Sequence, residues 1–355
     1  MRLLIVDDSA FMRTALSSMF KSEPGFQTAT ARNGKEALAL IASFDPDVIT
    51  LDINMPEMDG LTCLAHIMTE SPRPVVMLSS LTTAGALAGF EAMNMGAVDC
   101  IAKPGGTVSL EVGGIREQIV ARVRAAAGAR VRKGRGPTAP SPERSRGGLK
   151  PSGVSKSAPS AAPRGAHGLV VVGASTGGPG ALEDLLISLP PTFPWPIIIA
   201  QHMPAEFTRA LAQRLDGVCA IEVVEVSSIM ALRPGAAFIA RGDADMLLSR
   251  RGASHFVLPA PADKRYVWHP SVDRLMSSVL DNHPPAQVVA ILLTGMGHDG
   301  ADTMAELRRR GGRTIAESRD TAVVFGMPAE LIDRGGAEVV LPLPEISGQL
   351  RRWVG

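Results

Sequence analysis

Short apolar runs alternate with longer amphipathic stretches over the first 127 residues. The apolar runs predict strands buried on both faces, because such strands have continuous hydrophobic sequences. They lie at residues 3–6, 28–31, 48–51, 74–78 and 100–102. Apolar residues at helical spacing occupy residues 10–20, 35–43, 61–69 and 84–94, and one more helix leads to residue 127. Five successive βα units predict a doubly wound α/β domain with a parallel sheet.

Residues 169–355 repeat this alternation at a larger scale. Continuous apolar runs at residues 169–172, 197–200 and 288–293 predict buried parallel strands, and two later strands are expected at residues 314–316 and 338–341. The runs at residues 237–240, 246–248 and 256–258 lie between glycine-containing turns and predict an antiparallel hairpin insertion. We therefore expect a second doubly wound, Rossmann-like domain that carries this insertion.

The segment between these two domains, residues 128–168, is rich in Gly, Pro and Ser and has few large aliphatic residues. Such a segment cannot bury enough apolar surface to offset its ordering entropy, so it predicts a flexible linker. The net charge of +1 divides into −4 for residues 1–127, +8 for the linker and −3 for residues 169–355. A nucleic-acid-binding arm is the alternative for the basic segment. Because the segment has no aromatic residues for base stacking, we expect no nucleic-acid partner.

Cysteine use and hydropathy restrict the cellular setting. The three cysteines, Cys63, Cys100 and Cys219, are odd in number and far apart, which favours neither a disulfide framework nor a metal site. An acidic residue, Asp7, comes before any signal-peptide apolar region, and no apolar run reaches the roughly 18–20 residues that a membrane span needs. We expect a cytoplasmic monomer with no direct membrane insertion.

Polar residues collect at the carboxyl ends of the first five predicted strands. Asp7 and Asp8 follow the first, Asp52 the third, Ser79 the fourth and Lys103 the fifth. Ligands of open α/β sheets bind at this edge, and Mg²⁺ favours one or two carboxylates together with phosphate oxygens. Each aspartate alone is more often a simple strand-end or helix-cap residue. All five positions together favour a site that binds a cation and a phosphoryl group.

A second candidate site begins in the turn after residue 172. Residues 173–180 read Gly-Ala-Ser-Thr-Gly-Gly-Pro-Gly between a predicted strand and a predicted helix. This arrangement exposes the Ser175 hydroxyl beside backbone N–H groups, as acyl transfer requires, and it satisfies the G-x-S-x-G pattern. A nucleotide-binding loop is the alternative, since helix N-termini also bind phosphate. The spacing of both common nucleotide-binding motifs is absent, which favours a serine nucleophile.

A nucleophilic serine needs a base, and the base needs an orienting acid. His202 directly follows the strand predicted at residues 197–200, and Asp299 follows the one at residues 288–293. All three side chains therefore lie at carboxyl ends of parallel strands, where they can converge. His298 lies in the same segment as Asp299 and is an alternative base. The other histidines form no zinc-binding spacing.

The first half resembles the response-regulator receiver domain. The motifs that carry the resemblance are Val6-Asp7-Asp8-Ser9, Leu51-Asp52-Ile53-Asn54-Met55-Pro56-Glu57-Met58-Asp59-Gly60 and Lys103-Pro104. The resemblance implies that Asp52 is the phosphoacceptor, that Asp7 and Asp8 organise Mg²⁺ with Asp52, and that Ser79 and Lys103 sense the phosphoryl group. Receivers usually carry an aromatic residue three positions before the lysine, where this chain has Cys100.

The second half resembles the catalytic domain of the chemotaxis protein-glutamate methylesterase (CheB) family. The matching segments are Ser175 with its glycine-rich turn, Gln201-His202-Met203-Pro204, Pro270-Ser271-Val272-Asp273, residues 295–300 and Phe325-Gly326-Met327-Pro328. The resemblance implies a Ser175–His202–Asp299 triad, an oxyanion hole of backbone N–H groups at Thr176 and Met296, and no cofactor in this domain. Two segments depart from the family pattern: Arg241 and Ala244 replace proline and histidine, and residues 317–319 replace a Gln-Asp-Glu-like run.

Receiver, linker and catalytic domain in this order are the architecture of that family. The resemblance implies a phosphorylation-activated methylesterase, and a glutamine deamidase, acting on methyl-accepting chemoreceptors in chemotaxis adaptation. It further implies a histidine kinase as phosphodonor and a receiver that blocks the triad before phosphorylation. One alternative is a non-catalytic response regulator whose second half binds a partner. A serine esterase with another substrate is the other.

Overall fold

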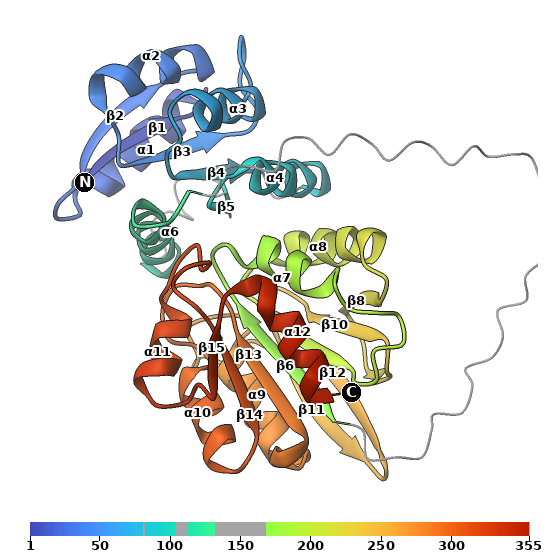
Figure 1. The fold of residues 1–355 in the computed structure, drawn as a ribbon. Coiled ribbons are helices and arrows are strands. Elements are labelled where there is room, and N and C mark those ends of the chain that lie inside the picture. Colours follow the sequence, from blue (N-terminus) through green and yellow to red (C-terminus); the bar gives the residue numbers. More distant parts are fainter. Residues whose placement is uncertain (81, 104–112, 132–167, 355) are drawn as a thin grey trace, which may run out of the picture.

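The computed structural model describes residues 1–80, 82–103, 113–131 and 168–354. They form two α/β bodies, each built on a parallel sheet with helices on both faces, which confirms the predicted fold class (Figure 1). The predicted linker, residues 128–168, lies largely outside the described residues, so its flexibility stays a prediction. Within the described ranges, no helix has the length and apolar character needed to cross a bilayer.

The N-terminal body contains a five-stranded parallel sheet in the order β2-β1-β3-β4-β5. Its strands are β1 (Arg2–Val6), β2 (Gln27–Ala31), β3 (Val48–Asp52), β4 (Val75–Ser79) and β5 (Asp99–Ala102). Its helices are α1 (Ala10–Lys21), α2 (Gly34–Phe44), α3 (Gly60–Glu70), α4 (Thr83–Met95) and α6 (Gly113–Ala127). Strands β3 and β4 are buried at every position, as their continuous apolar runs predict.

Local capping explains where the helices of this body begin. The side chains of Ser9, Asn33, Asp59 and Thr82 each accept a hydrogen bond from the backbone N–H three residues later. Each cap satisfies one of the N–H groups that the first helical turn leaves without a partner. Each capped helix therefore starts shortly after a strand ends, so the strand-to-helix turns line the carboxyl edge of the sheet.

The C-terminal body contains a seven-stranded parallel sheet in the order β15-β14-β13-β6-β7-β10-β8. Its strands are β6 (Leu169–Ala174), β7 (Ile197–Gln201), β8 (Glu222–Val226), β10 (Ala236–Ala240), β13 (Val288–Leu292), β14 (Arg313–Glu317) and β15 (Val339–Leu341). A separate antiparallel sheet consists of β11 (Ala244–Arg251), β12 (Ser254–Pro261) and β9 (Met230–Ala231). The helices are α7 (Gly178–Leu186), α8 (Ala205–Val218), α9 (Val272–Asn282), the short 3₁₀ helix η1 (Pro285–Gln287), α10 (Ala301–Arg309), α11 (Met327–Asp333) and α12 (Leu343–Val354).

One predicted assignment is wrong. The run at residues 237–240 was expected in the antiparallel insertion, but it forms β10, which pairs in parallel with both β7 and β8. Glycines at residues 235 and 242 suggested hairpin turns, yet all five residues of β10 are buried, as in a central parallel strand. The runs at residues 246–248 and 256–258 do form the predicted hairpin, as β11 and β12.

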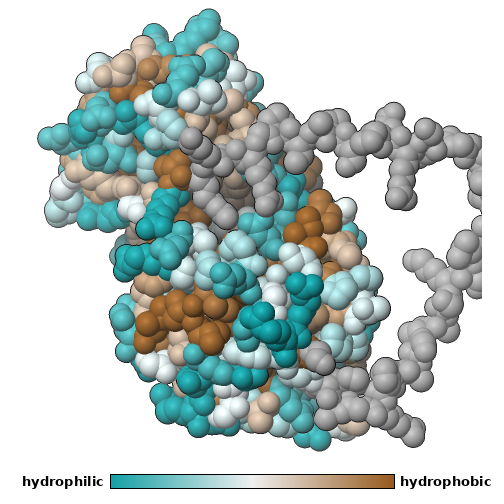
Figure 2. Space-filling model, in the orientation of Figure 1, coloured by the Kyte–Doolittle hydropathy of each residue, from teal (hydrophilic) through white to brown (hydrophobic). Residues whose placement is uncertain are grey.

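The register of the large sheet positions its carboxyl edge. Ala174 at the end of β6 lies opposite Gln201 at the end of β7, so Ser175 and His202 follow at neighbouring positions. The adjacent strand β13 ends at Leu292, opposite Gly173. Apolar side chains on both faces of the sheet hold these strands in place. On the face drawn in Figure 2, hydrophilic residues surround separate apolar patches.

The two bodies meet through apolar and polar side chains. Helix α4 of the N-terminal body lies against α8 of the C-terminal body, as Figure 1 shows. Phe90 of α4 and Phe207 of α8 form an edge-on aromatic pair with ring centroids 6.5 Å apart. Both rings are buried, so this pair contributes apolar contact area where the bodies meet. The carboxyl edge of the large sheet faces the N-terminal body.

Candidate active site and acidic pocket

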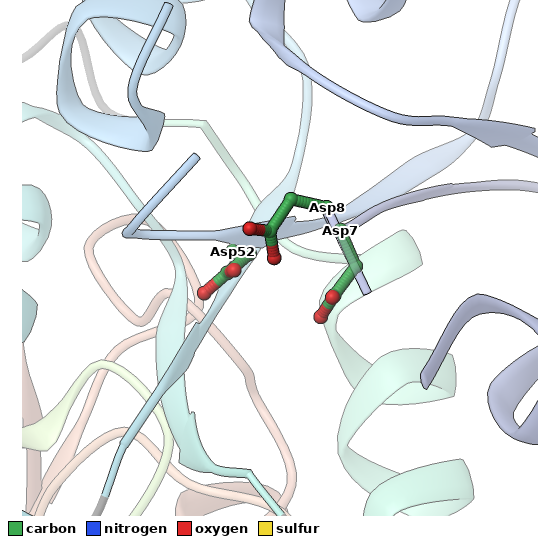
Figure 3. Close-up of side chains that lie close together, drawn as sticks. All are labelled: Asp7, Asp8 and Asp52. Atoms are coloured by element: carbon green, nitrogen blue, oxygen red, sulfur yellow. The ribbon is translucent and has the colours of Figure 1, made fainter. Parts of the chain in front are cut away.

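Three carboxylates gather at the carboxyl edge of the five-stranded sheet (Figure 3). Asp7 and Asp8 follow β1, and Asp52 ends β3; each offers an oxygen within 4.8 Å of the other two. Asp7 and Asp52 are buried, whereas Asp8 is exposed. Burial is the largest influence on Asp52 and, with the nearby charge of Asp7, raises the pKa of its carboxyl above the usual range.

Lys103 partly neutralises this cluster. Its Nζ lies 2.9 Å from Asp7 Oδ2 and 2.7 Å from Asp52 Oδ2. Burial opposes the charge on this lysine, but the hydrogen bonds and charges of the two aspartates prevail and raise its pKa. Ser79, at the end of β4, is buried, and its hydroxyl donates to the carbonyl oxygen of Ser80 at 3.3 Å. The structure therefore brings four of the five predicted residues into one cluster and places Ser79 at the same edge.

The acidic cluster fits a hard divalent cation. Its donor atoms are carboxylate oxygens, which Mg²⁺ prefers, and exposed Asp8 leaves one side of the cluster open to solvent. Among the residues that the structure describes, Lys103 is the cation that pairs with the Asp7 and Asp52 carboxylates. The three aspartates thus meet the chemical requirement for the predicted Mg²⁺ site.

Ser175 lies in the tight turn that joins β6 to α7. Gly177 has a φ of +78°, and a Cβ there would lie 2.6 Å from Val323 Cβ, so only glycine fits this turn. A Cβ on Gly295 would lie 2.7 Å from the Cβ of Ser175, so the loop after β13 approaches the serine closely for the same reason. Ser175 is 3% exposed. The glycines noted in the sequence thus hold a buried serine between two loops.

His202 and Asp299 form a buried hydrogen-bonded pair. The Nε2 atom of His202 lies 2.8 Å from Asp299 Oδ2. The other ring nitrogen, Nδ1, is buried and has no hydrogen-bond partner among the described residues. No hydrogen bond joins Ser175 Oγ to His202 in the described part of the chain. Because Nε2 contacts Asp299, Nδ1 is the ring nitrogen that remains able to accept a proton.

The start of α9 keeps Asp299 ionised. The Asp299 carboxylate accepts hydrogen bonds from Val272 N at 2.7 Å, Asp273 N at 2.9 Å and Ser271 Oγ at 3.0 Å. Burial alone would raise the pKa of Asp299, but the His202 contact and these N–H donors outweigh it and lower that pKa. A helix N-terminus favours a negative charge in the same way. Asp299 is therefore held as an anion within hydrogen-bonding distance of His202 Nε2.

The two backbone groups predicted as an oxyanion hole have suitable surroundings. Neither Thr176 N nor Met296 N donates to a protein acceptor among the described residues. The threonine is buried, and the loop of Met296 contacts Ser175 through Gly295. Both N–H groups thus remain able to bind an oxygen beside the serine. His298, the alternative base, is exposed, and its carbonyl oxygen accepts from Ala301 N.

Residues of the N-terminal body reach this site, which the sequence did not reveal. Asp99, the first residue of β5, accepts a hydrogen bond from Thr176 Oγ1 at 2.9 Å. Arg122 of α6 donates to the carbonyl oxygen of His202 at 3.3 Å and lies 3.5 Å from the Asp99 carboxylate. Gln118 and Arg122 line one wall of a cavity of about 280 Å³ whose opposite wall includes His202 and Trp268. The N-terminal body therefore contacts residues next to the candidate active site.

Fold and site together define a class of protein: an α/β domain with an acidic receiver-type pocket, placed over a second α/β domain with a buried serine and a His–Asp pair. Family comparison agrees with both halves. The CheB methylesterase family matches residues 170–350, and the response regulator receiver domain family matches residues 3–111.

Similar proteins extend this agreement over the whole chain. The protein-glutamate methylesterase/protein-glutamine glutaminase 3 of Rhodospirillum rubrum is 51% identical, over 99% of this chain and 96% of the relative. The corresponding protein 2 of Rhodopseudomonas palustris is 50% identical, over 99% of this chain and 98% of the relative. The crystal structure of the Thermotoga maritima CheB methylesterase catalytic domain matches with a TM-score of 0.51 and 37% identity, covering 53% of this chain and 99% of that one. The chain belongs to the CheB protein-glutamate methylesterase family, as its sequence motifs predicted.

Proposed function

We propose that this protein hydrolyses glutamyl methyl esters, and deamidates glutamines, on chemoreceptors, with Ser175, His202 and Asp299 as its catalytic residues. The buried His202–Asp299 hydrogen bond carries this proposal, because it orients the imidazole and leaves only Nδ1 for proton transfer. The names of the relatives support the reaction. The resemblance of the sequence motifs to the CheB family supports chemoreceptors as the substrates.

The reaction follows the acyl-transfer scheme. His202 Nδ1 takes the Ser175 proton while Oγ attacks the γ-carbonyl carbon of the ester, and Asp299 stabilises the resulting imidazolium. The N–H groups of Thr176 and Met296 bind the oxyanion of the tetrahedral intermediate. The imidazolium gives the proton to the ester oxygen as the C–O bond breaks and methanol leaves, or to the amide nitrogen of glutamine as the C–N bond breaks and ammonia leaves. Water then attacks the acyl-enzyme with His202 again as base, which releases glutamate and regenerates the serine.

Asp52 is the proposed phosphoacceptor in the receiver. Asp7, Asp8 and Asp52 would hold Mg²⁺, which when bound neutralises charge between the carboxylates and the phosphoryl group. The Asp52 carboxylate would attack the phosphorus of a phosphohistidine on a histidine kinase, so that the P–N bond breaks and the kinase histidine leaves. Lys103 would then leave Asp7 and Asp52 to pair with the new phosphoryl oxygens. Ser79, at the adjacent strand end, would donate to the same oxygens.

Phosphorylation would release the active site. In the described structure Asp99 and Arg122 of the receiver contact Thr176 and His202, so a receptor helix cannot reach the serine in this arrangement. Lys103 follows the same strand that begins with Asp99. A shift of this lysine toward a phosphoryl group would therefore move the strand that contacts Thr176. The proposed cytoplasmic location and monomeric state stay predictions.

Covalent labelling tests the nucleophile. A fluorophosphonate reacts with a serine that an adjacent base activates, so the wild-type protein should be labelled at Ser175 and the Ser175→Ala variant should not. A matched control is Ser188→Ala, which removes an exposed serine hydroxyl of the same domain, just after α7, without removing the proposed nucleophile. Equal labelling of wild type and Ser175→Ala would contradict the assignment and favour a non-catalytic output domain.

A further inference from the structure

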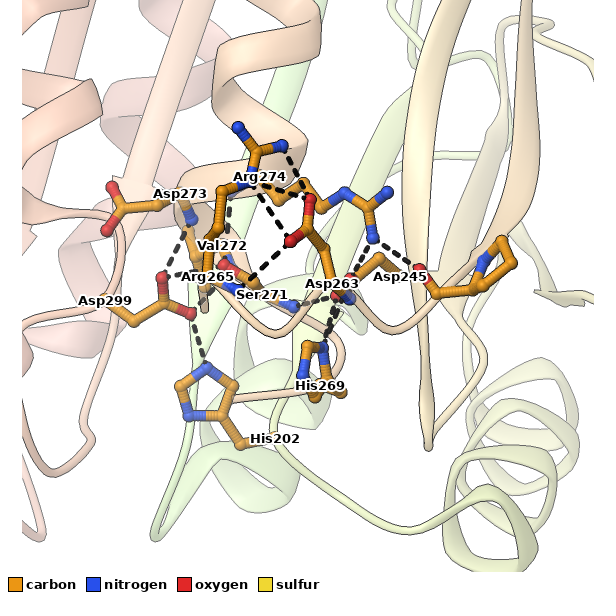
Figure 4. Close-up of polar contacts among 11 residues, drawn as sticks. His202, Asp245, Asp263, Arg265, His269, Ser271, Val272, Asp273, Arg274 and Asp299 are labelled. Atoms are coloured by element: carbon orange, nitrogen blue, oxygen red, sulfur yellow. Dashed lines mark hydrogen bonds and ion pairs between the residues drawn. The ribbon is translucent and has the colours of Figure 1, made fainter. Parts of the chain in front are cut away.

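A buried carboxylate lies beside the candidate active site and takes no part in the proposed reaction. Asp245 is near the start of β11, in the antiparallel sheet, and its side chain is fully buried. The carboxylate accepts a hydrogen bond from Ser271 N at 2.8 Å, lies 3.1 Å from His269 Nδ1 and pairs with Arg274 (Figure 4). A buried carboxylate is costly unless it is paired in this way, so these contacts fix the segment around Ser271 to the sheet.

The same segment holds both members of the His–Asp pair. At one end, the Trp268 indole stacks on the imidazole of His202, with ring centroids 5.1 Å apart and planes 8° from parallel. At the other end, Ser271 Oγ and the N–H groups of residues 272 and 273 bind the Asp299 carboxylate. Figure 4 shows Asp245 and Asp299 on opposite sides of this segment. One stretch of seven residues, 268–274, therefore connects a buried anchor to the base and to the acid that orients it.

We propose that Asp245 is a positioning residue for the His202–Asp299 pair. By anchoring residues 268–274, it keeps the imidazole between the Trp268 ring and the Asp299 carboxylate. This inference rests on the proposed function. It gives the antiparallel insertion a part in catalysis, although none of the proposed catalytic residues lies in that insertion.

The Trp268 stack gives the segment a specific effect on the reaction. The ring face of an indole attracts a cation, so Trp268 interacts more strongly with the imidazolium than with neutral imidazole. The imidazolium exists only after His202 has taken the serine proton. The stack therefore stabilises the transition state more than the substrate complex, and its loss lowers kcat while KM stays nearly constant.

The first test replaces Asp245 in the full-length protein. Asp245→Asn keeps the size of the side chain and one acceptor oxygen but removes the charge that Arg274 pairs with. We expect a fall in kcat of about 10- to 100-fold, as a small misplacement of catalytic groups produces, with KM changed by less than about twofold. Asp281→Asn is the matched control, because Asp281 is an exposed aspartate on α9 and makes none of the contacts that anchor residues 268–274. It should keep wild-type kinetics.

A fluorescence readout separates positioning from general stability. With Trp195 and Trp353 replaced by phenylalanine, Trp268 is the remaining tryptophan of the chain. In this background, Asp245→Asn should raise acrylamide quenching of Trp268 while the far-ultraviolet circular dichroism stays unchanged. Unchanged quenching together with unchanged kcat would overturn the proposal. So would a loss of kcat that follows the loss of folded protein alone.

A second variant covers the case in which Asp245→Asn does not fold. Trp268 is partly exposed, so Trp268→Ala can be made without opening the core. It should lower kcat by about 3- to 10-fold at constant KM, and Trp268→Phe should restore part of that loss. Wild-type kcat for Trp268→Ala would refute the role of the segment. If Ser175→Ala retained full activity, the proposed function would fail instead, so the two failures are distinguishable.

Discussion

Arg122 provides the most direct perturbation of the contact between the receiver and the active site. Its guanidinium is largely buried, with 12% of the side chain exposed, and it bridges the His202 carbonyl oxygen and the Asp99 carboxylate. Arg122→Ala removes both contacts and leaves the Asp99 carboxylate with Thr176 Oγ1 and the backbone N–H of Cys100 as donors. Because His202 and Thr176 belong to the catalytic domain, we expect this change to favour the open, active arrangement.

The size of the effect follows from the charged hydrogen bond between the two bodies that is lost, from Arg122 to the His202 carbonyl oxygen. Hydrogen bonds to charged groups contribute about 1.5–3 kcal/mol, and about 1.4 kcal/mol corresponds to a tenfold change in an equilibrium constant. The closed-to-open ratio should therefore fall about 10- to 100-fold. The basal rate of ester hydrolysis should rise by the same factor until the open form predominates.

The assay is methanol release without a phosphodonor, with Arg124→Ala as the control. Arg124 lies on the same helix but contacts Pro24, Glu23 and Phe26 within the receiver. Arg122→Ala should raise the basal rate and reduce stimulation by a phosphodonor, and Arg124→Ala should change neither. An unchanged basal rate for Arg122→Ala would refute the argument that this contact restrains the enzyme.

Three further predictions concern phosphorylation and stability. Asp52→Asn should incorporate no phosphate from a small-molecule phosphodonor and show no stimulation; stimulation equal to wild type would remove Asp52 from the mechanism. Chelation of divalent cations should abolish phosphate incorporation but leave basal hydrolysis unchanged, since the catalytic residues include no cation-binding set; equal incorporation after chelation would contradict the Mg²⁺ site. Burial, then the nearby His255, lowers the pKa of His283 to about 4, below its unfolded value of about 6.5. The wild type should therefore lose up to about 3 kcal/mol of unfolding free energy between pH 6.5 and pH 4, because the unfolded state binds the proton first, and His283→Asn should lose less in urea titrations.

The sequence predicted that the candidate site residues gather, because they follow the carboxyl ends of parallel strands. Apolar runs that form parallel strands end at the same edge of the sheet, so polar residues that directly follow them lie close together. Asp7 therefore lies near Asp52, and His202 lies near Asp299. The orientation of β10 was not predictable in this way. Strand direction depends on which neighbours a strand pairs with, and the glycines around residues 236–240 suggested hairpin turns instead.

Contacts between distant segments were also beyond sequence reasoning. Thr176 and Asp99 are 77 positions apart and belong to separately folded bodies, so no local pattern predicts their hydrogen bond. The sequence around Asp245 predicts only a strand, and the proposed role of Asp245 depends on its contacts with residues 268–274. The motif Pro270-Ser271-Val272-Asp273 indicated importance, but only the structure shows that its N–H groups hold Asp299.

The central claim is that Ser175 hydrolyses receptor methyl esters under control of Asp52. Methanol release from membranes that contain methylated chemoreceptors, measured with and without a phosphodonor, tests both parts at once. The wild type should release methanol and release it faster with the phosphodonor, and Ser175→Ala should release none under either condition. Methanol release by Ser175→Ala at the wild-type rate would contradict the account.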